Sequence, residues 1–390
     1  MPWNPNEPYN DLPDLPPKVE VETKAILKAS IEARDALAHL NEAVQRLPNP
    51  DVLIAPISLQ EARDSSEIEN IVTTDDALFR LVDDQDNRAD PSSKEALRYR
   101  AALYQGYSGL KSRPVGTNTA IEICRTLKGV DLDIRAVPGT TLRNQSTREV
   151  IYTPPNGQDV IRSKLANWEH FVHDDGLDAL VRIAIQHYQF EAIHPFNDGN
   201  GRTGRILNIL LLVEQQLLSY PVLYLSRHIL RTKNEYYNLI RGVTERGSWH
   251  EWIEYFFDIL VTSAAESETK ANLVQILMIH TEAHMKLYAP KLISAEFSSV
   301  LFAQPYCRIS DLTAKGVAKR QTASNYLQIL SRAGILKEIK IGRDKLFVHS
   351  KFLELLTTDG RQILEYSGNA LAPAKLMFPP SESPPTAQTA

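Results

Sequence analysis

The chain has 390 residues, enough for two or three domains, and its composition of 43% hydrophobic and 23% charged residues excludes a fibrous or wholly disordered protein. Its net charge of −5 favours no class of partner when the chain is taken as a whole. The chain shows no secretory pattern and no run of roughly 18 apolar residues, and its two cysteines lie far apart in sequence. We therefore expect a soluble cytoplasmic protein without a membrane partner or disulfides.

The N-terminal part is expected to be helical after a coil. Residues 1–17 are rich in proline, asparagine and aspartate, so we expect them to be extended. Apolar residues at helical spacing then predict a helix over 18–47, which a pair of prolines ends. A shorter helix is expected to begin at Ser58, because Glu61 three residues later would complete a capping box. The polar residues 83–94 predict a surface loop.

One segment differs from its helical surroundings. Residues 150–153 are β-branched or aromatic, and strong turn signals follow at 154–157, which predicts a β-hairpin over 148–161. Elsewhere helical spacing predicts further helices over 95–110, 177–190, 202–218, 233–243, 249–264 and 267–287. We therefore expect a mainly α fold with one small hairpin near its centre.

The C-terminal part changes in charge and pattern. Residues 306–349 carry nine Lys or Arg and three Asp or Glu, a net charge of +6, so the remainder carries −11. A helix, a turn, a second helix and a strand pair are predicted there, with the regular elements at 309–314, 322–333, 336–341 and 345–348. This is the order of a winged helix-turn-helix. After about residue 368 the composition predicts a disordered tail.

Two uses of this winged helix stay open. Polar and basic residues suited to DNA phosphates and base edges open its second helix, namely Lys319, Arg320, Gln321, Thr322, Ser324 and Asn325. The alternative is a wing for protein interaction or dimerisation, which would make the protein a homodimer. The net positive charge favours DNA only slightly, because a solvated basic face is common.

The chemistry of the chain concentrates in residues 194–205, which are His-Pro-Phe-Asn-Asp-Gly-Asn-Gly-Arg-Thr-Gly-Arg. Gly199, Asn200 and Gly201 come directly before a helix, and such a segment can turn backbone N–H groups towards an anion at the positive helix end. Arg202 and Arg205 are three residues apart on that helix, so both can reach phosphate oxygens. The pattern is neither a dinucleotide fingerprint nor a P-loop, since it lacks their flanking residues.

The other motif residues complete a site for phosphoryl or nucleotidyl transfer. Asp198 supplies one carboxylate, and one carboxylate with substrate phosphates is how Mg²⁺ is usually held. His194 is a titratable base that can take a proton from an attacking hydroxyl, while Phe196 would anchor the loop in the core. Each residue alone is more often a surface group or a turn, but twelve in this order favour a functional site.

These twelve residues match at every specified position the His-x-Phe-x-Asp/Glu-Gly-Asn-Gly-Arg-x-x-Arg signature of the Fic family, which the chain resembles over most of its length. The resemblance implies a compact helical fold and transfer of AMP from Mg·ATP to Ser, Thr or Tyr hydroxyls of proteins. It implies that His194 is the general base and Asp198 the Mg²⁺ ligand. The phosphates would be cradled by Gly199, Asn200, Gly201, Arg202, Thr203, Gly204 and Arg205.

Two more features resemble parts of the family. Tyr237 lies where members place an aromatic residue near the adenine, although tyrosine at helical spacing is more often part of the core. The hairpin resembles the flap that docks the target by strand pairing, through Val150, Ile151, Tyr152 and Thr153. A purely structural hairpin is the alternative.

Residues 65–70, Ser-Ser-Glu-Ile-Glu-Asn, resemble the inhibitory Ser/Thr-x-x-x-Glu-Gly/Asn motif of the family. Glu69 is the only glutamate of the chain that Gly or Asn follows, and Ser65 shares its helix face. If Glu69 pairs with Arg205, it occupies the guanidinium meant for the γ-phosphate and adds negative charge where ATP brings more. The regulatory residues are therefore Ser65, Glu69 and Asn70, and an ordinary charged helix face is the alternative.

The predicted organisation is an N-terminal helical region over 1–100, a Fic core over 101–290, a winged helix over 291–360 and a tail over 361–390. The leading hypothesis is a self-inhibited protein adenylyltransferase that uses ATP and Mg²⁺, and that can also modify itself or remove AMP. Other members transfer phosphate, UMP or phosphocholine, but the second arginine favours AMP. The alternative is a nucleotide-sensing transcriptional regulator whose winged helix does the biological work.

Overall fold

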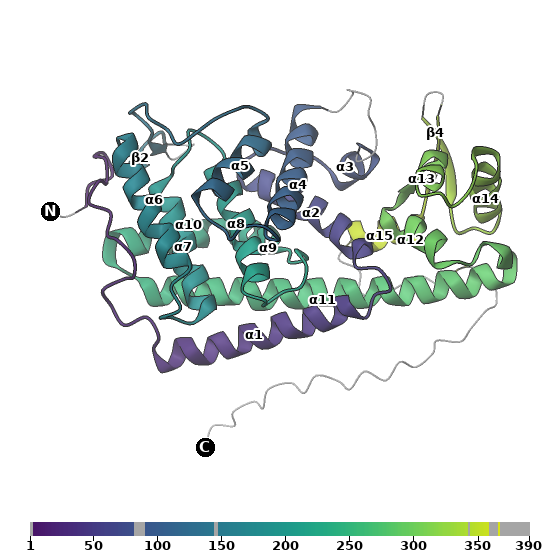
Figure 1. Ribbon diagram of the computed structural model, residues 1–390, viewed down its shortest axis with the longest axis horizontal. Helices are drawn as coiled ribbons and strands as arrows, with labels where there is room; N and C mark the ends of the chain where they lie inside the picture. The colour runs from purple at the N-terminus through teal and green to yellow at the C-terminus, as the bar shows by residue number, and fades with distance from the viewer. Residues whose placement is uncertain (1–2, 82–89, 144–146, 342–343, 359–365, 367–390) are drawn as a thin grey trace, which may run out of the picture.

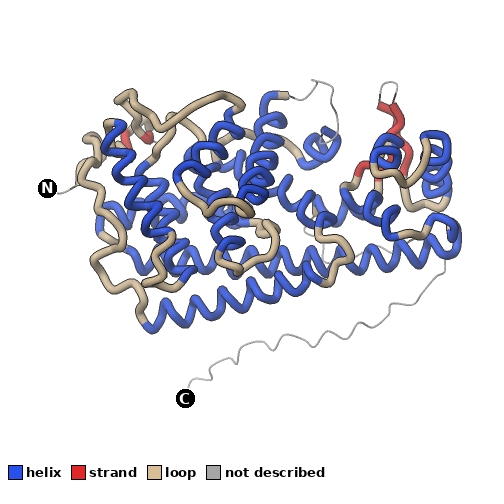
Figure 2. Tube along the Cα trace, in the orientation of Figure 1, coloured by secondary structure: helices blue, strands red, loops and turns tan. Residues whose placement is uncertain are grey.

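A computed structural model describes residues 3–81, 90–143, 147–341, 344–358 and 366. The described chain is mainly helical, as predicted, and its strands form two small antiparallel sheets (Figure 2). The longest helix, α11 (Trp249–Tyr288), runs along the length of the molecule with α1 (Lys24–Gln45) packed beside it (Figure 1). The other labelled elements lie above this pair in the same view.

The remaining elements before α11 are α2 (Asp51–Ile68), α3 (Asp75–Leu81), α4 (Pro91–Gly109), α5 (Thr117–Lys128), β1 (Leu142–Arg143), β2 (Val150–Tyr152), α6 (Gln158–Val172), α7 (Ala179–Ile193), α8 (Asn200–Glu214), α9 (Leu225–Arg231) and α10 (Lys233–Arg246). After α11 come the 3₁₀-helix η1 (Pro290–Leu292), α12 (Ala295–Ala303), β3 (Tyr306–Cys307), α13 (Ile309–Ala314), α14 (Arg320–Arg332), β4 (Lys337–Ile341), β5 (Asp344–Val348) and α15 (Ser350–Thr357). The C-terminal sheet has the strand order β3-β5-β4, with Glu338 opposite Phe347.

The predicted helix starts near the N-terminus were wrong. The first helix begins at Lys24 rather than at residue 18, because the Thr23 side chain caps it by accepting from the Ile26 N–H. The second helix begins at Asp51 rather than at Ser58, whose hydroxyl donates to the Ala55 carbonyl inside the helix. Fourteen of the 18 residues of α2 are buried, so its apolar residues cover more than one face. A one-sided stripe, the signal used to predict helices, is therefore missing.

The predicted hairpin also needs correction. The partner of β2 is β1, which precedes it and pairs Leu142 with Tyr152, while residues 154–157 lead into α6. The helices predicted over 249–264 and 267–287 are one continuous helix, α11. The helix predicted from residue 95 begins at Pro91, since the Asp90 side chain accepts from the Ser93 N–H. Residues 83–89 of the predicted loop, and the predicted tail except Tyr366, lie outside the described residues.

Six of the described α-helices, α3, α5, α6, α9, α12 and α15, were not predicted from the sequence at all. Two of them, α5 and α6, frame the motif region, since α5 packs on α8 and α6 packs on α7. The motif loop itself connects α7 and α8, which are bonded through a hydrogen bond of 2.7 Å from Gln186 Nε2 to Asn208 Oδ1. Both amides are buried, so this bond fixes the two helices relative to each other.

The C-terminal part is attached to α2 and to the segment just before it by polar contacts. Asn49, just before α2, donates to the Ser299 hydroxyl of α12 at 2.7 Å. The Gln60 amide of α2 donates to the Leu356 carbonyl in the last turn of α15. The buried Lys270 ammonium of α11 completes this contact, with Nζ 2.7 Å from Gln60 Oε1 and 3.3 Å from the Leu356 oxygen. One helix end is thus capped by side chains from two other helices.

Among the described residues, no helix combines the length and the hydropathy needed to cross a bilayer. Cys124 and Cys307 are both buried and unbridged.

Asp178 caps α7, the helix that ends at the predicted base, and its removal should destabilise the fold. Its carboxylate accepts from the Leu180 N–H, the Ser30 hydroxyl and the Arg34 guanidinium at 2.6–2.9 Å. We expect Asp178→Ala to lower the free energy of unfolding by about 1–3 kcal/mol in urea titrations. Asp175→Ala is the control, because that side chain is 97% exposed and should cost no more than about 0.5 kcal/mol.

The effect should depend on pH. Partial burial opposes ionisation, but the Arg34 and Ser30 hydrogen bonds outweigh it and lower the pKa of Asp178 below its ordinary 3.8. The carboxylate therefore stabilises the fold above that value, and its contribution disappears as the pH falls through the folded pKa. The difference between wild type and Asp178→Ala should be full at pH 7 and should shrink towards pH 2. A difference that stays constant would contradict this account.

Candidate active site

His194 closes α7 in a left-handed backbone conformation. Its φ and ψ are 50° and 60°, and its N–H donates to the Phe190 carbonyl at 3.1 Å. A non-glycine residue rarely adopts this conformation, which therefore requires surrounding contacts to hold it. The result is that the chain turns sharply at His194, so the imidazole stands at the start of the motif loop instead of continuing the helix face.

The imidazole of His194 is neutral at physiological pH. Burial, and then the nearby Arg135 charge, lower its pKa from the ordinary 6.5 to about 4. Nδ1 lies 3.4 Å from the Glu191 carbonyl oxygen, a long contact that leaves Nε2 for an incoming hydroxyl if Nδ1 carries the proton. A neutral imidazole is the form that can accept a proton, so the environment suits the predicted role of a base.

The loop is braced by side chains of the motif itself. Phe196 is 1% exposed, which agrees with its predicted role as an apolar anchor. The Asn200 amide bonds both sides of the Phe196 peptide, with Oδ1 accepting from its N–H and Nδ2 donating to its carbonyl, each at 2.8 Å. The Asn200 side chain is thus used inside the loop, and only its main chain can contact a phosphate. Gly199 has a φ of 88°, which favours glycine at this turn.

Arg205 is fully enclosed and held by α2. Its Nε donates to the Ser65 hydroxyl and its NH2 to the Ser65 carbonyl, both at 2.8 Å, and NH2 also lies 3.1 Å from Glu69 Oε1. The guanidinium is 1% exposed, so these partners supply what water would otherwise supply. The predicted contact between Glu69 and Arg205 is therefore present in the structure.

The Glu69 carboxylate also covers the first turn of α8. A Cβ placed on Gly201 would lie 2.5 Å from Glu69 Oε1 and 3.0 Å from an Arg205 nitrogen. The first N–H groups of a helix have no partner within the helix, and its positive end attracts anions. Glu69 thus places a negative oxygen beside the main chain of Gly201, where the sequence predicts a phosphate.

The end of α2 fixes where Glu69 stands. Asn70 has a φ of 65°, its N–H donates to the Glu67 carbonyl, and the Ile71 N–H donates to the Ser66 carbonyl. This pair of bonds is the Schellman arrangement, which needs a left-handed residue after the helix. Asn is one of the few residues besides Gly that tolerates it. Asn70 therefore acts through the backbone, by ending the helix with Glu69 facing α8.

Arg202 and Asp198 form a second charged group on the other side of the loop. The buried Arg202 guanidinium pairs with the Glu95 carboxylate of α4 and lies 3.4 Å from Asp198 Oδ1. Asp198 Oδ2 accepts from Lys128 Nζ at 2.5 Å. Although partial burial opposes ionisation, the Lys128 hydrogen bond and charge lower the pKa of Asp198. Sequence reasoning missed both Glu95 and Lys128, which lie far from the motif and in no recognisable pattern.

These donors fit one way of holding a magnesium ion. The Asp198 side chain is 62% exposed, and the described residues contain no group of three or more acidic, His or Cys side chains that could hold a metal. A protein site of one accessible carboxylate leaves most positions to phosphate oxygens and water, which suits Mg²⁺. The Lys128 ammonium now on this carboxylate would have to move aside.

The remaining predicted residues are placed less directly. Thr203 is buried beside the Cys124 thiol, so its side chain is not available to a phosphate. A Cβ on Gly204 would lie 2.5 Å from Glu191 Oε1, so a larger residue there would have to displace that side chain. Tyr237 is 45% exposed and packs edge-on against the buried Tyr236 at 5.2 Å. Partial burial and the nearby Glu69 raise the pKa of Tyr237, so its ring lies close to the Glu69 carboxylate.

The predicted docking strand is only partly free. The Tyr152 hydroxyl donates to the Ala192 carbonyl at 2.8 Å, and its ring packs on Trp3. The Thr153 hydroxyl donates to the Pro5 carbonyl, and the Thr153 carbonyl accepts from the Tyr9 N–H. These two residues thus anchor the N-terminal segment, whereas Val150 and Ile151 are half-buried.

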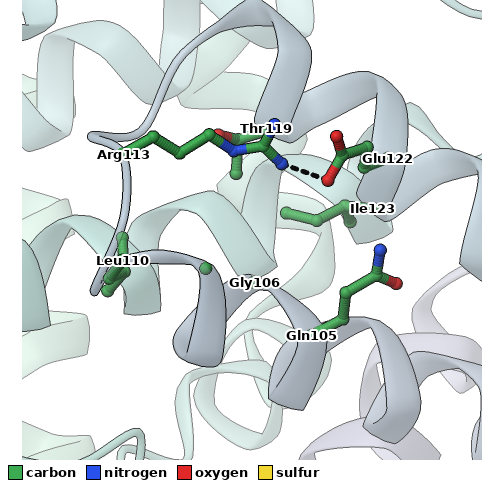
Figure 3. A pocket seen from close by; sticks show the side chains of 8 residues that line it. Gln105, Gly106, Leu110, Arg113, Thr119, Glu122 and Ile123 are labelled. Atoms are coloured by element: carbon green, nitrogen blue, oxygen red, sulfur yellow. Dashed lines mark hydrogen bonds and ion pairs between the residues drawn. The ribbon is translucent and has the colours of Figure 1, made fainter.

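A pocket between α4 and α5 lies apart from these residues (Figure 3). The Arg113 guanidinium and the Glu122 carboxylate form an ion pair across it. None of the predicted site residues lines this pocket, so it does not coincide with the motif region.

Three family models match successive parts of the chain. The Fic/DOC family N-terminal model matches residues 27–108, the Fic/DOC family model matches 117–212, and the C-terminal domain model of SoFic-like protein adenylyltransferases matches 277–352. The second of these includes the whole motif loop. The chain therefore contains Fic/DOC domains.

Individual relatives are more distant. A probable protein adenylyltransferase of Aquifex aeolicus is 33% identical over 147 residues, which are 34% of this chain and 44% of that protein. Protein adenylyltransferase Fic of Drosophila willistoni is 26% identical over 153 residues, 37% of this chain and 29% of that protein. The chain thus matches less than half the length of these relatives. A solved Fic family protein from Desulfovibrio desulfuricans shares the fold, with a TM-score of 0.56 and 17% identity over 86% of this chain and 98% of that one.

The cap at Asn70 can be tested separately from the chemistry. A β-branched residue is poorly tolerated in the left-handed region, so Asn70→Val should lower the free energy of unfolding by roughly 1–2 kcal/mol. Asn70→Gly should leave it nearly unchanged, because glycine adopts this conformation freely. Urea titrations of both variants and wild type measure the difference. Equal stability of the Val and Gly variants would show that the cap does not depend on this conformation.

Proposed function

We propose that this Fic protein is a protein adenylyltransferase that transfers AMP from Mg·ATP to Ser, Thr or Tyr hydroxyls, and that Glu69 inhibits it at rest. The names of the Aquifex and Drosophila relatives support the reaction class. The observation that carries the proposal is that one loop joins a neutral His194 to the anion-binding start of α8 and to Arg205. These are the base and the charge-neutralising groups that nucleotidyl transfer needs.

In the proposed reaction the target hydroxyl attacks the α-phosphorus of ATP, and its proton moves to the His194 imidazole. The bond between the α-phosphorus and the bridging oxygen breaks, and pyrophosphate leaves with that electron pair. A magnesium ion held by Asp198 would neutralise phosphate charge. The first N–H groups of α8 and the guanidinium of Arg205 would hold the phosphate oxygens.

The contacts of Glu69 support inhibition by occupation. Its carboxylate sits beside Gly201 and against Arg205, the two places that would bind phosphate oxygens. ATP would have to displace an anion already bound there, and any phosphate that shared the space would be repelled by it.

A target segment would pair with β2 near Val150 and Ile151, because Tyr152 and Thr153 already hold the N-terminal segment. Self-modification, removal of AMP and a cytoplasmic location remain predictions.

The decisive experiment is AMP transfer from α-labelled ATP into a cell lysate, with labelled proteins identified. Removing the Glu69 carboxylate frees Arg205, so Glu69→Gly should raise labelling roughly tenfold or more, which corresponds to about 1.4 kcal/mol. Adding His194→Ala to this variant should abolish labelling. Glu67→Gly is the matched control, since it places the same substitution two residues earlier in α2. Labelling by Glu69→Gly no greater than that by wild type would refute the inhibitory role.

A second role, binding of DNA, has a specific observation in its favour. In α14 the side chains of Ala323 and Leu327 are buried, while Lys319, Arg320 and Gln321 at its start are exposed. A turn separates it from α13, and the strand pair β4–β5 follows, which is the order of a winged helix-turn-helix. The exposed basic start of the second helix is suited to phosphate contacts. This supports the alternative of a nucleotide-sensing regulator.

The DNA role predicts binding that depends strongly on salt. Fluorescence anisotropy with duplex DNA should show affinity that falls steeply between about 50 and 200 mM salt, because bound phosphates release counterions. Replacing both Lys319 and Arg320 by Ala should reduce the slope of log affinity against log salt by about two. Absence of binding at the lowest salt would leave the C-terminal part as a protein-interaction or dimerisation module.

A further inference from the structure

Arg135, in the segment between α5 and β1, is a buried cation to which the proposed reaction assigns no role. Its side chain is 3% exposed. The guanidinium acceptors that the structure shows are main-chain oxygens: His194 at 2.7 Å from Nε, and Pro155 and Ile193 at 2.5 and 3.4 Å from NH2. The Arg135 N–H also donates to the Pro195 carbonyl at 3.0 Å.

These acceptors come from two places. The first place is the left-handed turn at the proposed general base, which contains the consecutive residues Ile193, His194 and Pro195. The second is Pro155, which follows β2, the strand of the predicted flap. A planar guanidinium holds its acceptors in fixed directions, so it joins the two segments as a rigid bracket. Burying a charge without a carboxylate is costly, and main-chain dipoles offset that cost only while both segments stay in place.

The charge also acts on the imidazole. Besides burial, the charge of Arg135 disfavours the protonated form and so contributes to the low pKa of His194. The other charged groups that influence this imidazole, Glu69 and Asp198, raise its pKa, as does the Glu191 carbonyl. Arg135 therefore opposes the effect of two carboxylates and adds to burial, the largest cause, in favouring the neutral base.

We propose that Arg135 is a positioning residue that holds His194 in register with the flap, and so sets the distance between the base and a hydroxyl carried on the docked target. This inference rests on the proposed AMP transfer. A base must come within about 2.6–3.2 Å of the proton it takes. Misplacement of a reacting group by 1 Å can cost about 100-fold in rate. A bracket between base and flap has that consequence, whereas a contact that served only folding would not.

The kinetic experiment uses full-length protein that carries Glu69→Gly, with a target identified by labelling. Arg135→Met should lower kcat by about 100-fold while KM for ATP changes less than about twofold, because the phosphate contacts are elsewhere. Arg135→Lys should recover part of kcat but not all, since it keeps the charge and loses the fork. Arg162→Met is the control. Arg162 is an exposed arginine of α6 that pairs with Asp133, which lies in the same segment as Arg135, and its replacement should leave both constants unchanged.

A second measurement does not depend on turnover. NMR titration of the histidines, with His194 assigned by comparison with His194→Ala, should show its pKa rising above about 4 in Arg135→Met but not in Arg135→Lys, while burial still holds it below 6.5. It can be read even if no AMP transfer exists, so it separates failure of this inference from failure of the proposed reaction. If the Arg135→Met variant does not fold, the loss of kcat in Arg135→Lys tests the inference by itself. A folded Met variant with unchanged kcat, or with an unchanged His194 pKa, would overturn the inference.

Discussion

The buried guanidinium of Arg205 is the constraint on which the rest of the site depends. A charge that is 1% exposed needs close partners, and the structure supplies them from α2 through Ser65 and Glu69. An ATP phosphate would also pair with this guanidinium, so ATP and the Glu69 carboxylate would compete for one cation. Glu69 is already in place, covalently attached and ordered by its helix cap, and so competes at a high local concentration. In the proposed enzyme, inhibition at rest would therefore need no domain movement.

Much of the site could be predicted because it lies in one short segment. The order from His194 to Arg205 predicts a base, a metal ligand, an anion site and two arginines, and the structure places the residues predicted for these roles around one loop. The contact of Glu69 with Arg205 spans 136 residues, yet its sequence pattern indicated it. Asn200 and Thr203 differ from the phosphate-binding role predicted for them, because the Asn200 side chain bonds within the loop and the Thr203 side chain is buried beside Cys124. A linear motif does not distinguish these two kinds of residue.

The rest depends on tertiary contacts that leave no local trace. Arg135 and Lys128 contact the motif from elements far along the chain, where a single arginine or lysine resembles any surface residue. The start of α2 was missed because a helix buried on most sides has no polar face, and β1 was missed because two residues carry too little strand signal. In α11, polar residues at 263–270 suggested a break between two helices, but neighbouring helices bury Ser263, Ser267 and Lys270.

The attachment of α2 to the C-terminal helices has a thermodynamic consequence. Gln60, which bonds the last turn of α15, and Glu69, which contacts Arg205, belong to the same buried helix and its cap. A ligand of the C-terminal helices that bound one position of α2 in preference to another would change the affinity for ATP. By reciprocity, ATP would change the affinity for that ligand by the same factor. ATP and that ligand would then each shift the same equilibrium, which is the one between two positions of α2.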